Sequence, residues 1–215
     1  ENNIQVQLTA TSRVGIHQYA FPTKDTGSIF IDLLHRDKTL KCNLKIIDSV
    51  TIIGSRVSEA WAQQQYVYFV MKFNKPIINK KLHIEPNDRQ KPNEEDKVTS
   101  AIIQFNMTDQ IPLMVKVGIS QTGTDGAMMN LLAEAPHWDF QKYKQDALQK
   151  WEEELSKIEI TTSNTQQAIV FYTALYHCFI HPSIASDVDG SYRGRDFKIH
   201  KAIKRRCIRW FCTQK

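Results

Sequence analysis

The period of the hydrophobic pattern changes near residue 130, and this change limits the possible folds more than any other feature of the chain. Before it come short strand-like runs: apolar residues alternate in Leu113–Ser120, which is the period of a β-strand, and Gln65–Phe73 has aromatic and β-branched residues on both faces, as in a strand buried between layers. After it, apolar residues recur at steps of three and four, which is one stripe of an amphipathic helix. The sequence therefore predicts a β domain followed by helices.

The first part of the chain predicts short strands joined by turns. Further runs of strand-forming residues are 4–9, 13–21, 28–34, 44–53 and 101–107. We predict that 44–53 is a single strand closed by Gly54, and that the polar stretch 79–99 is an exposed loop. Short strands with regular turns and no helix between them favour an antiparallel β-sandwich.

Two helices are predicted after the change of period. The first covers 138–158, and the second begins at Ser163, where Gln166 completes a capping-box pattern. Apolar residues cover more than one face of the second helix, as in a helix buried on several sides; they are Phe171, Tyr172, Leu175, Tyr176 and Phe179. We place a sandwich domain at 1–135, a connecting helix at 136–160 and the start of a helical domain at 161–200.

The net charge of +5 comes from the last fifteen residues. This tail, 201–215, has six basic residues and no acidic one, and without it the chain has 22 basic and 23 acidic residues. The body thus has no basic surplus to neutralise phosphates, which argues against nucleic-acid binding. The tail also lacks periodicity, so we interpret it as aberrant. A reading-frame change near residue 202, a cloning artefact and a real basic appendage are the alternatives.

Composition and motifs exclude several other classes. An apolar fraction of 41% and a charged fraction of 24% are typical of a globular protein. No apolar run approaches the roughly 18 residues that cross a membrane, and the N-terminus lacks the features of a signal peptide. Four cysteines without a C-x-x-C spacing predict reduced thiols. Nucleotide-binding glycine motifs and the G-x-S-x-G motif are missing.

Three segments, taken together, resemble one enzyme family. Residues 171–196 read FYTALYHCFIHPSIASDVDGSYRGRD, an aromatic helix followed by a loop of the form S-D-V-D-G-x-Y-R-G. Residues 13–22 read RVGIHQYAFP, and 54–70 contain GSRVS, WA and YFV. In this order the segments resemble glycoside hydrolase family 92, the bacterial calcium-dependent exo-acting α-mannosidases, over residues 1 to about 200.

The resemblance implies an N-terminal β-sandwich without its first strands, followed by the start of an (α/α)6-toroid catalytic domain. It implies an inverting exo-α-mannosidase of α-1,2 type that removes terminal mannose from N-glycans or mannans, with Ca²⁺ as cofactor. Inverting glycosidases use two carboxylates roughly 6.5–9.5 Å apart. The resemblance places that pair and the calcium ligands outside this chain, so we expect no catalytic residue, no metal ligand and no activity here. It also implies a periplasmic, secreted or cell-surface location in a bacterium.

The resemblance places candidate substrate-binding residues on the loop of 171–196; they are Asp187, Asp189, Tyr192, Arg193 and Asp196. Carboxylates accept hydrogen bonds from sugar hydroxyls, and an arginine donates them. Two interpretations stay open: at least one residue contacts the sugar, or an Asp–Arg pair fixes a tight loop. An EF-hand is not supported, because the twelfth position from Asp187 is Lys198 instead of glutamate. The competing function is a non-catalytic β-sandwich module that binds carbohydrate.

Overall fold

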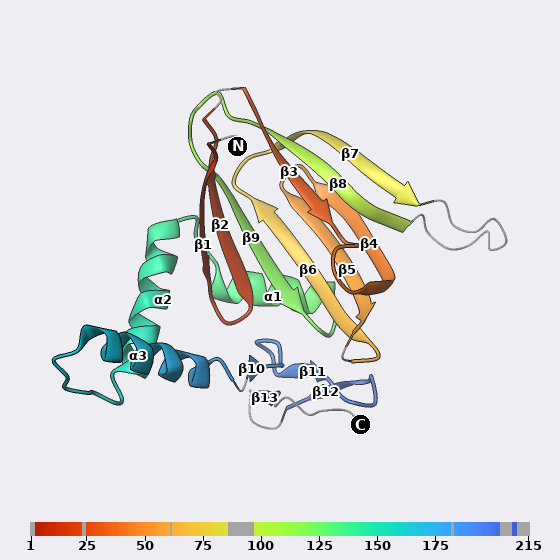
Figure 1. The fold of residues 1–215 in the computed structure, drawn as a ribbon. Coiled ribbons are helices and arrows are strands. Elements are labelled where there is room, and N and C mark those ends of the chain that lie inside the picture. Colours follow the sequence, from red (N-terminus) through yellow and green to blue (C-terminus); the bar gives the residue numbers. More distant parts are fainter. Residues whose placement is uncertain are drawn as a thin grey trace.

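Strands β1 to β9 form two antiparallel sheets that pack face to face, which confirms the predicted β-sandwich (Figure 1). The computed structural model describes residues 3–22, 25–60, 62–85, 97–181, 183–202 and 208–209. One sheet has six strands in the order β1-β2-β9-β6-β5-β4, and the other has three in the order β3-β8-β7. The bounds are β1 Gln5–Ala10, β2 Val14–Ala20, β3 Thr26–Asp32, β4 Lys38–Asp48, β5 Thr51–Glu59, β6 Gln65–Phe73, β7 Ile77–Glu85, β8 Lys97–Asn106 and β9 Leu113–Ser120.

The core between the sheets is built from alternate residues of each strand. On β9, Leu113 and Val115 are fully buried and belong to this core. Phe73 of β6 and Phe105 of β8 meet there with ring centroids 4.8 Å apart. Because side chains alternate between the faces of a strand, Met114 points to the opposite face of the six-stranded sheet and belongs to a second core.

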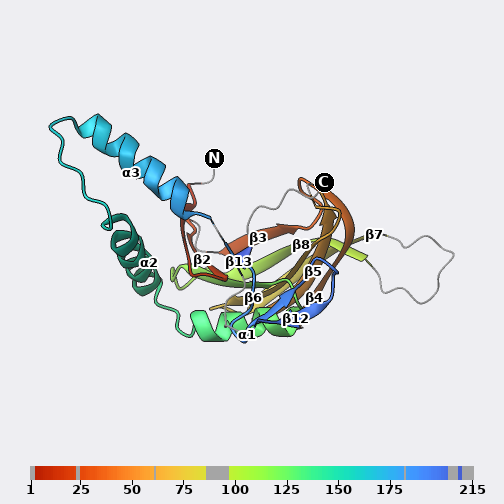
Figure 2. The same cartoon turned by 90° about the horizontal axis from the view of Figure 1, so that it is seen from below.

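Helix α1 (Thr124–Glu134) covers that opposite face (Figure 2). Its buried Ala127 and Leu131 pack in the second core with Val14 and Val70 of the sheet. The approach is close: a Cβ added at Gly118 of β9 would lie 2.5 Å from the Ala127 carbonyl oxygen. This helix was not among the predicted elements, because its apolar residues do not form a clear stripe. The six-stranded sheet therefore lies between the three-stranded sheet and α1.

Helices α2 (Phe140–Leu155) and α3 (Thr165–Phe179) confirm the two predicted helices. The first turn of α2 packs in the second core through Phe140 and Tyr143, and α3 extends away from the sandwich (Figure 2). Asp139 begins α2, where its carboxylate accepts a hydrogen bond from the Lys142 amide. The predicted cap of α3 at Ser163 is wrong by one residue. Asn164 caps this helix. Its Oδ1 accepts hydrogen bonds from the backbone amides of Gln166 and Gln167, the second and third residues of the helix, which is the usual arrangement for an asparagine N-cap.

Two strand predictions are corrected by the structure. Residues 44–53 are not one strand, because a turn at 49–50 separates β4 from β5. The Asp48 carboxylate accepts from the Val50 amide and so stabilises this turn. Gly54 does not close a strand but lies within β5, where a Cβ would be 2.3 Å from the Phe69 ring. The predicted loop 79–99 is partly wrong, since β7 and the start of β8 lie in it; residues 86–96 lie outside the described residues.

Two short two-stranded sheets follow α3, and only β11 and β12 form a hairpin. Strand β10 (Ser183–Ile184) pairs with β13 (Ile208–Arg209), and β11 (Ser191–Arg193) pairs with β12 (Ile199–Lys201). Most of the tail 201–215 lies outside the described residues, so the interpretation of that tail stays a prediction. Among the helices that the structure describes, none is long and apolar enough to cross a membrane.

Candidate functional site

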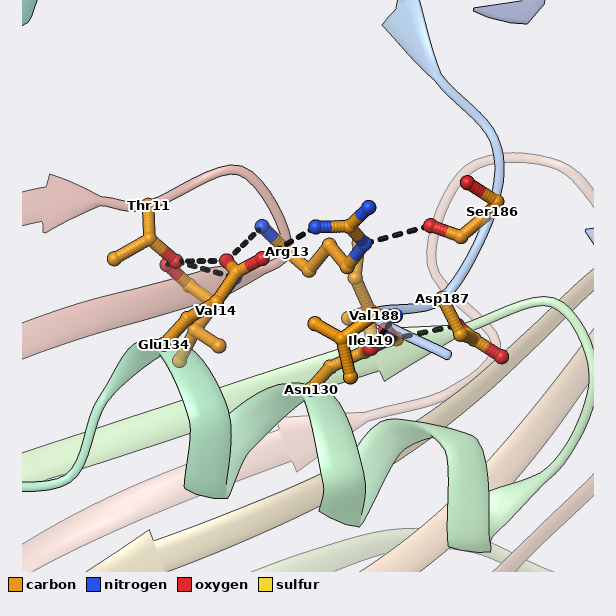
Figure 3. A network of polar contacts seen from close by, with 9 residues as sticks. All are labelled: Thr11, Arg13, Val14, Ile119, Asn130, Glu134, Ser186, Asp187 and Val188. Atoms are coloured by element: carbon orange, nitrogen blue, oxygen red, sulfur yellow. Dashed lines mark hydrogen bonds and ion pairs between the residues drawn. The ribbon is translucent and has the colours of Figure 1, made fainter. Parts of the chain in front are cut away.

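The S-D-V-D-G loop is anchored to the sandwich through the buried carboxylate of Asp187, which is 3% exposed. Its Oδ2 accepts hydrogen bonds from the Ser120 hydroxyl at 2.7 Å and the Thr122 hydroxyl at 2.6 Å. Its Oδ1 accepts from Asn130 Nδ2 at 2.7 Å (Figure 3). Three donors therefore hold the carboxylate, as a buried charge requires.

Asn130 lies on α1, is 0% exposed and joins three parts of the chain. Its Nδ2 donates to the Ile119 carbonyl at 2.8 Å as well as to Asp187, and its Oδ1 accepts from the Val188 amide at 2.8 Å. Nδ2 faces two acceptors and Oδ1 faces one donor, so the orientation of the Asn130 side-chain amide is fixed. Helix α1, strand β9 and the S-D-V-D-G loop meet at this one side chain.

Arg13, the first residue of the R-V-G-x-H motif, reaches the same loop. Its Nε donates to the Ser186 carbonyl at 2.6 Å, and its guanidinium pairs with the Glu134 carboxylate at 2.5 Å (Figure 3). Glu134, at the end of α1, also accepts from the Thr11 hydroxyl and the Arg13 amide. Both charged side chains are largely buried, with 13% and 16% exposed. The structure thus brings together two motifs that are about 170 residues apart.

An open pocket of about 490 Å³ lies beside this ion pair. It is mostly polar and lies between the β1–β2 turn, the end of α1, helix α2 and the S-D-V-D-G loop. Its lining residues are Thr11, Ser12, Arg13, Ala133, Glu134, Lys150, Ile184 and Val188.

Arg193 links the β11–β12 hairpin to the edge of the sandwich. Its Nε donates to the Gln121 carbonyl at 2.8 Å, and one terminal nitrogen donates to the Phe197 carbonyl at 2.6 Å. The guanidinium lies 4.1 Å from the centre of the Tyr66 ring of β6, which is a cation–π geometry. Arg56 of the G-S-R-V-S segment likewise donates hydrogen bonds to backbone carbonyls of the β3–β4 connection.

The other three candidates lie at or near the surface of this hairpin. Asp189 accepts from the amide and hydroxyl of Ser191, and these hydrogen bonds lower the pKa of its carboxyl group below the usual value. Asp196 accepts from His200 Nε2 at 2.9 Å, and this hydrogen bond is the main cause of its lowered pKa. Tyr192 is half-buried, with its ring 5.6 Å from that of His200.

The five candidates therefore divide into two groups. Asp187 and Arg193 bind residues of the sandwich and its connection to α1, whereas the polar contacts of Asp189 and Asp196 stay within the segment of β11 and β12, which also bears the half-buried Tyr192. Their contact with a sugar stays a prediction. Sequence reasoning missed Ser120, Thr122, Asn130 and Glu134, because no motif contains them and they are between 57 and 123 residues from their partners. Trp61, the tryptophan of the W-A pair in the 54–70 motif, lies outside the described residues.

No group of three or more histidine, cysteine, aspartate or glutamate side chains that could hold a metal occurs in the part of the chain that the structure describes. Asp187 is surrounded by hydroxyl and amide donors, which suit a carboxylate and would oppose a cation. The described residues therefore do not fit the calcium ion that the family resemblance implies, and we derive no step through it.

Similarity to known proteins agrees with this arrangement. The Glycosyl hydrolase family 92 N-terminal domain matches residues 1–120, and the Glycosyl hydrolase family 92 catalytic domain matches residues 126–210. No curated protein matches the chain. The catalytic-domain match begins within α1, so the residues of α1 that hold the S-D-V-D-G loop lie in the same matched region as that loop.

The solved structures that resemble the chain include the family GH92 alpha-mannosidase BT3965 from Bacteroides thetaiotaomicron. It is 28% identical with a TM-score of 0.82, and the match covers 95% of this chain and 29% of that chain. The gh92 family glycosyl hydrolase ccman5 is 22% identical, with a TM-score of 0.84 and coverages of 97% and 29%. The inverting mannosidase BT2199 from Bacteroides thetaiotaomicron VPI-5482 is 19% identical, with a TM-score of 0.79 and coverages of 97% and 28%.

The last two likenesses, at under 25% identity, show the fold alone. The chain spans less than a third of the length of the structures that it matches. Within that span the two family models follow one another along almost the whole chain, and the N-terminal model alone covers more than half of it. This chain therefore belongs to glycosyl hydrolase family 92.

Proposed function

We propose that this chain is part of an inverting, exo-acting α-mannosidase of α-1,2 type that removes terminal mannose from N-glycans or mannans. The observation that carries the proposal is the ordered match to both domains of the family, together with 28% identity to an alpha-mannosidase. The match to the catalytic domain favours an enzyme over a non-catalytic carbohydrate-binding module, because such a module has no use for this second domain.

Within that enzyme, the hairpin after α3 supplies polar contacts to the terminal sugar. Asp189 and Asp196 have lowered pKa values because they accept hydrogen bonds, so both are carboxylates at neutral pH and accept from sugar hydroxyls. Tyr192 lies between them on β11. Asp187 and Arg193 act from the protein side, because their polar atoms hold the hairpin in place.

The remaining parts of the mechanism belong to residues beyond this chain. We expect the acid–base pair and the calcium ligands there, so the 215-residue chain should not hydrolyse an α-mannoside. A periplasmic, secreted or cell-surface location in a bacterium is part of the same proposal, and a mannose-containing glycan is the partner.

The test compares the 215-residue chain with the product of the complete gene, after the locus has been sequenced beyond codon 215. Both are incubated with an α-1,2-linked mannobioside, and the first-formed mannose anomer is observed by proton NMR. We expect β-mannose from the complete protein, loss of turnover with EDTA, recovery with Ca²⁺, and no turnover by the shorter chain. First formation of α-mannose would contradict inversion, and turnover by the purified shorter chain would contradict the placement of the acid–base pair.

A further inference from the structure

Asn130 is a buried polar residue that the proposed reaction does not use and that none of the three motifs contains. It is 0% exposed and forms three hydrogen bonds, to Ile119, Asp187 and Val188. Two of these three bonds run to the S-D-V-D-G loop, 57 and 58 residues further along the chain. We propose that Asn130 is the positioning residue of the candidate sugar site, and this inference rests on the proposed function.

The hydrogen bonds of the loop carry this constraint from Asn130 to the candidate residues. The Asp187 amide donates to the Ser191 carbonyl at 2.8 Å, and the Gly190 amide donates to the Asp187 carbonyl at 2.9 Å. The Ala202 amide then donates to the Gly190 carbonyl at 2.8 Å. Strands β11 and β12, which bear Tyr192 and His200, lie between these bonds. Fixing Asp187 and Val188 on α1 therefore fixes the base of the whole hairpin.

Helix α1 is shaped for this contact one turn before Asn130. A Cβ added at Gly126 would lie 2.4 Å from Asp187 Oδ2, and 2.7 Å or less from the hydroxyls of Ser120 and Thr122. Only a glycine leaves room there for the carboxylate to reach the helix, and this observation is independent of the Asn130 hydrogen bonds.

The chemistry of the contact makes Asn130 distinguishable from an aspartate of equal size. The Nδ2 group points at a carboxylate and a carbonyl, while Oδ1 points at an amide. In Asn130→Asp, a second carboxylate would face Asp187 without a donor between them. Two carboxylates this close repel one another when both are ionised, and at lower pH one proton held between them relieves the repulsion. The shared proton would replace the lost N–H donor.

The experiment measures hydrogen exchange of the Val188 amide and of the amides of Asp187, Gly190 and Ala202 in the 215-residue chain. In Asn130→Asp we expect their protection factors to fall by about tenfold or more at neutral pH, because buried hydrogen bonds are lost. We expect recovery as the pH is lowered, once the two carboxyls hold a proton between them. Protection of the wild-type chain should stay level over the same range.

A swap variant and a matched control complete the design. Asn130→Asp with Asp187→Asn keeps both side-chain sizes and restores a donor facing a carboxylate, so loop protection should return in part at neutral pH, while the Ile119 carbonyl stays without its donor. Asn164→Asp makes the same change at the exposed cap of α3, where the oxygen still accepts from the two amides, and should leave the loop unchanged. Amides of β6 and β9 report whether the sandwich is folded; if Asn130→Asp unfolds it, the swap variant decides alone.

Wild-type protection in Asn130→Asp at neutral pH would overturn the inference. So would a loss that neither lower pH nor the swap recovers, because Asn130 would then serve only the packing of α1. These measurements involve no mannoside, so they can fail while the complete enzyme is active. The converse also holds, since an inactive complete protein with the expected exchange pattern would refute the proposed function and leave the role of Asn130 intact.

Discussion

The sandwich and the helical extension have similar residues but bury them very differently. In the sandwich, Phe73, Phe105 and Val115 are at most 2% exposed, because the two sheets face one another. Helix α3 has no buried residue, and Ile169 and Val170 are 55% and 60% exposed. An apolar pattern therefore predicts that a face is buried, but it does not identify the element that packs against that face. We expect the α2 and α3 faces to be covered in a complete catalytic domain, since this chain spans 29% of BT3965.

The largest expected difference in stability between the two regions is at their phenylalanines. Phe105 is 0% exposed between the sheets, and Phe179 of α3 is 37% exposed. Phe105→Ala should lower the free energy of unfolding by about 3–5 kcal/mol, because it removes a buried ring and leaves a cavity. Phe179→Ala should change it by less than about 0.5 kcal/mol, as an exposed substitution does. Urea unfolding followed by tryptophan fluorescence measures both, and equal losses would show that α3 is part of the cooperative core.

Lys116 of β9 joins the two regions and gives the second prediction. It is 3% exposed, and its ammonium group donates to the carbonyls of Ala135 and His137 and lies 3.9 Å from the Trp138 ring centre. These three residues form the connection between α1 and α2. Burial, and secondarily the nearby positive charge of Lys72, lowers the pKa of Lys116 from 10.5 to about 8.

The sign of the pH effect follows from the lowered pKa. Between about pH 8 and pH 10.5 the unfolded chain holds this proton and the folded chain has lost it, so stability rises with pH over that window. The shift corresponds to roughly 3 kcal/mol. Against Lys116→Met, the wild-type chain should therefore gain up to about that much between neutral and alkaline pH. Ionising tyrosines affect both proteins and cancel in the difference. A difference that is independent of pH would show that Lys116 keeps an ordinary pKa.

Gly118 and Gly123 test how closely α1 packs on the six-stranded sheet. A Cβ at Gly118 would lie 2.5 Å from the Ala127 carbonyl oxygen and 2.7 Å from the Leu131 Cβ, whereas one at Gly123 meets nothing within 4 Å. Backbone cannot move aside cheaply, so Gly118→Ala should cost about 1–3 kcal/mol. Gly123→Ala should stay within about 0.5 kcal/mol, because its φ of 175° is extended backbone. Thermal unfolding compares the two, and a neutral Gly118→Ala would mean that α1 packs loosely on the sheet.

The sequence predicted the regular part of the fold because local pattern determines it. Strands β6 and β9 were predicted at their observed bounds, since strand-forming residues in β6 and alternation in β9 are local signals. The β4–β5 turn was missed because it contains neither glycine nor proline, although Asp48-Ser49 was an available turn signal. Strand β7 was missed because its polar residues suggested a loop. It is an edge strand, where lysines such as Lys80 and Lys81 are common.

The candidate site could be predicted only in part. Asp187 and Arg193 were found through a motif that is contiguous in sequence. Their partners Ser120, Thr122 and Asn130 come from β9, the connection that follows it and α1, and nothing in the sequence indicates that these residues meet the loop. Helix α1 itself was missed because its contacts with the sheet, and not an amphipathic pattern, stabilise it. Tertiary contacts of this kind become visible only in the folded chain.

The smallest expected effect on stability lies on the exposed face of α3. Replacing both Ile169 and Val170 by serine removes apolar surface that is more than half exposed, so the free energy of unfolding of the sandwich should change by less than about 0.5 kcal/mol. Solubility should change much more, because contiguous exposed apolar surface promotes association. Light scattering on heating should show a higher onset of aggregation in the double variant, while the unfolding midpoint in urea stays the same. Replacing Thr161 and Thr162, also exposed, by serine is the control. If the double variant aggregated like wild type, the sandwich and not the helices would be the source of association, and the contrast between the two regions would lose its main consequence.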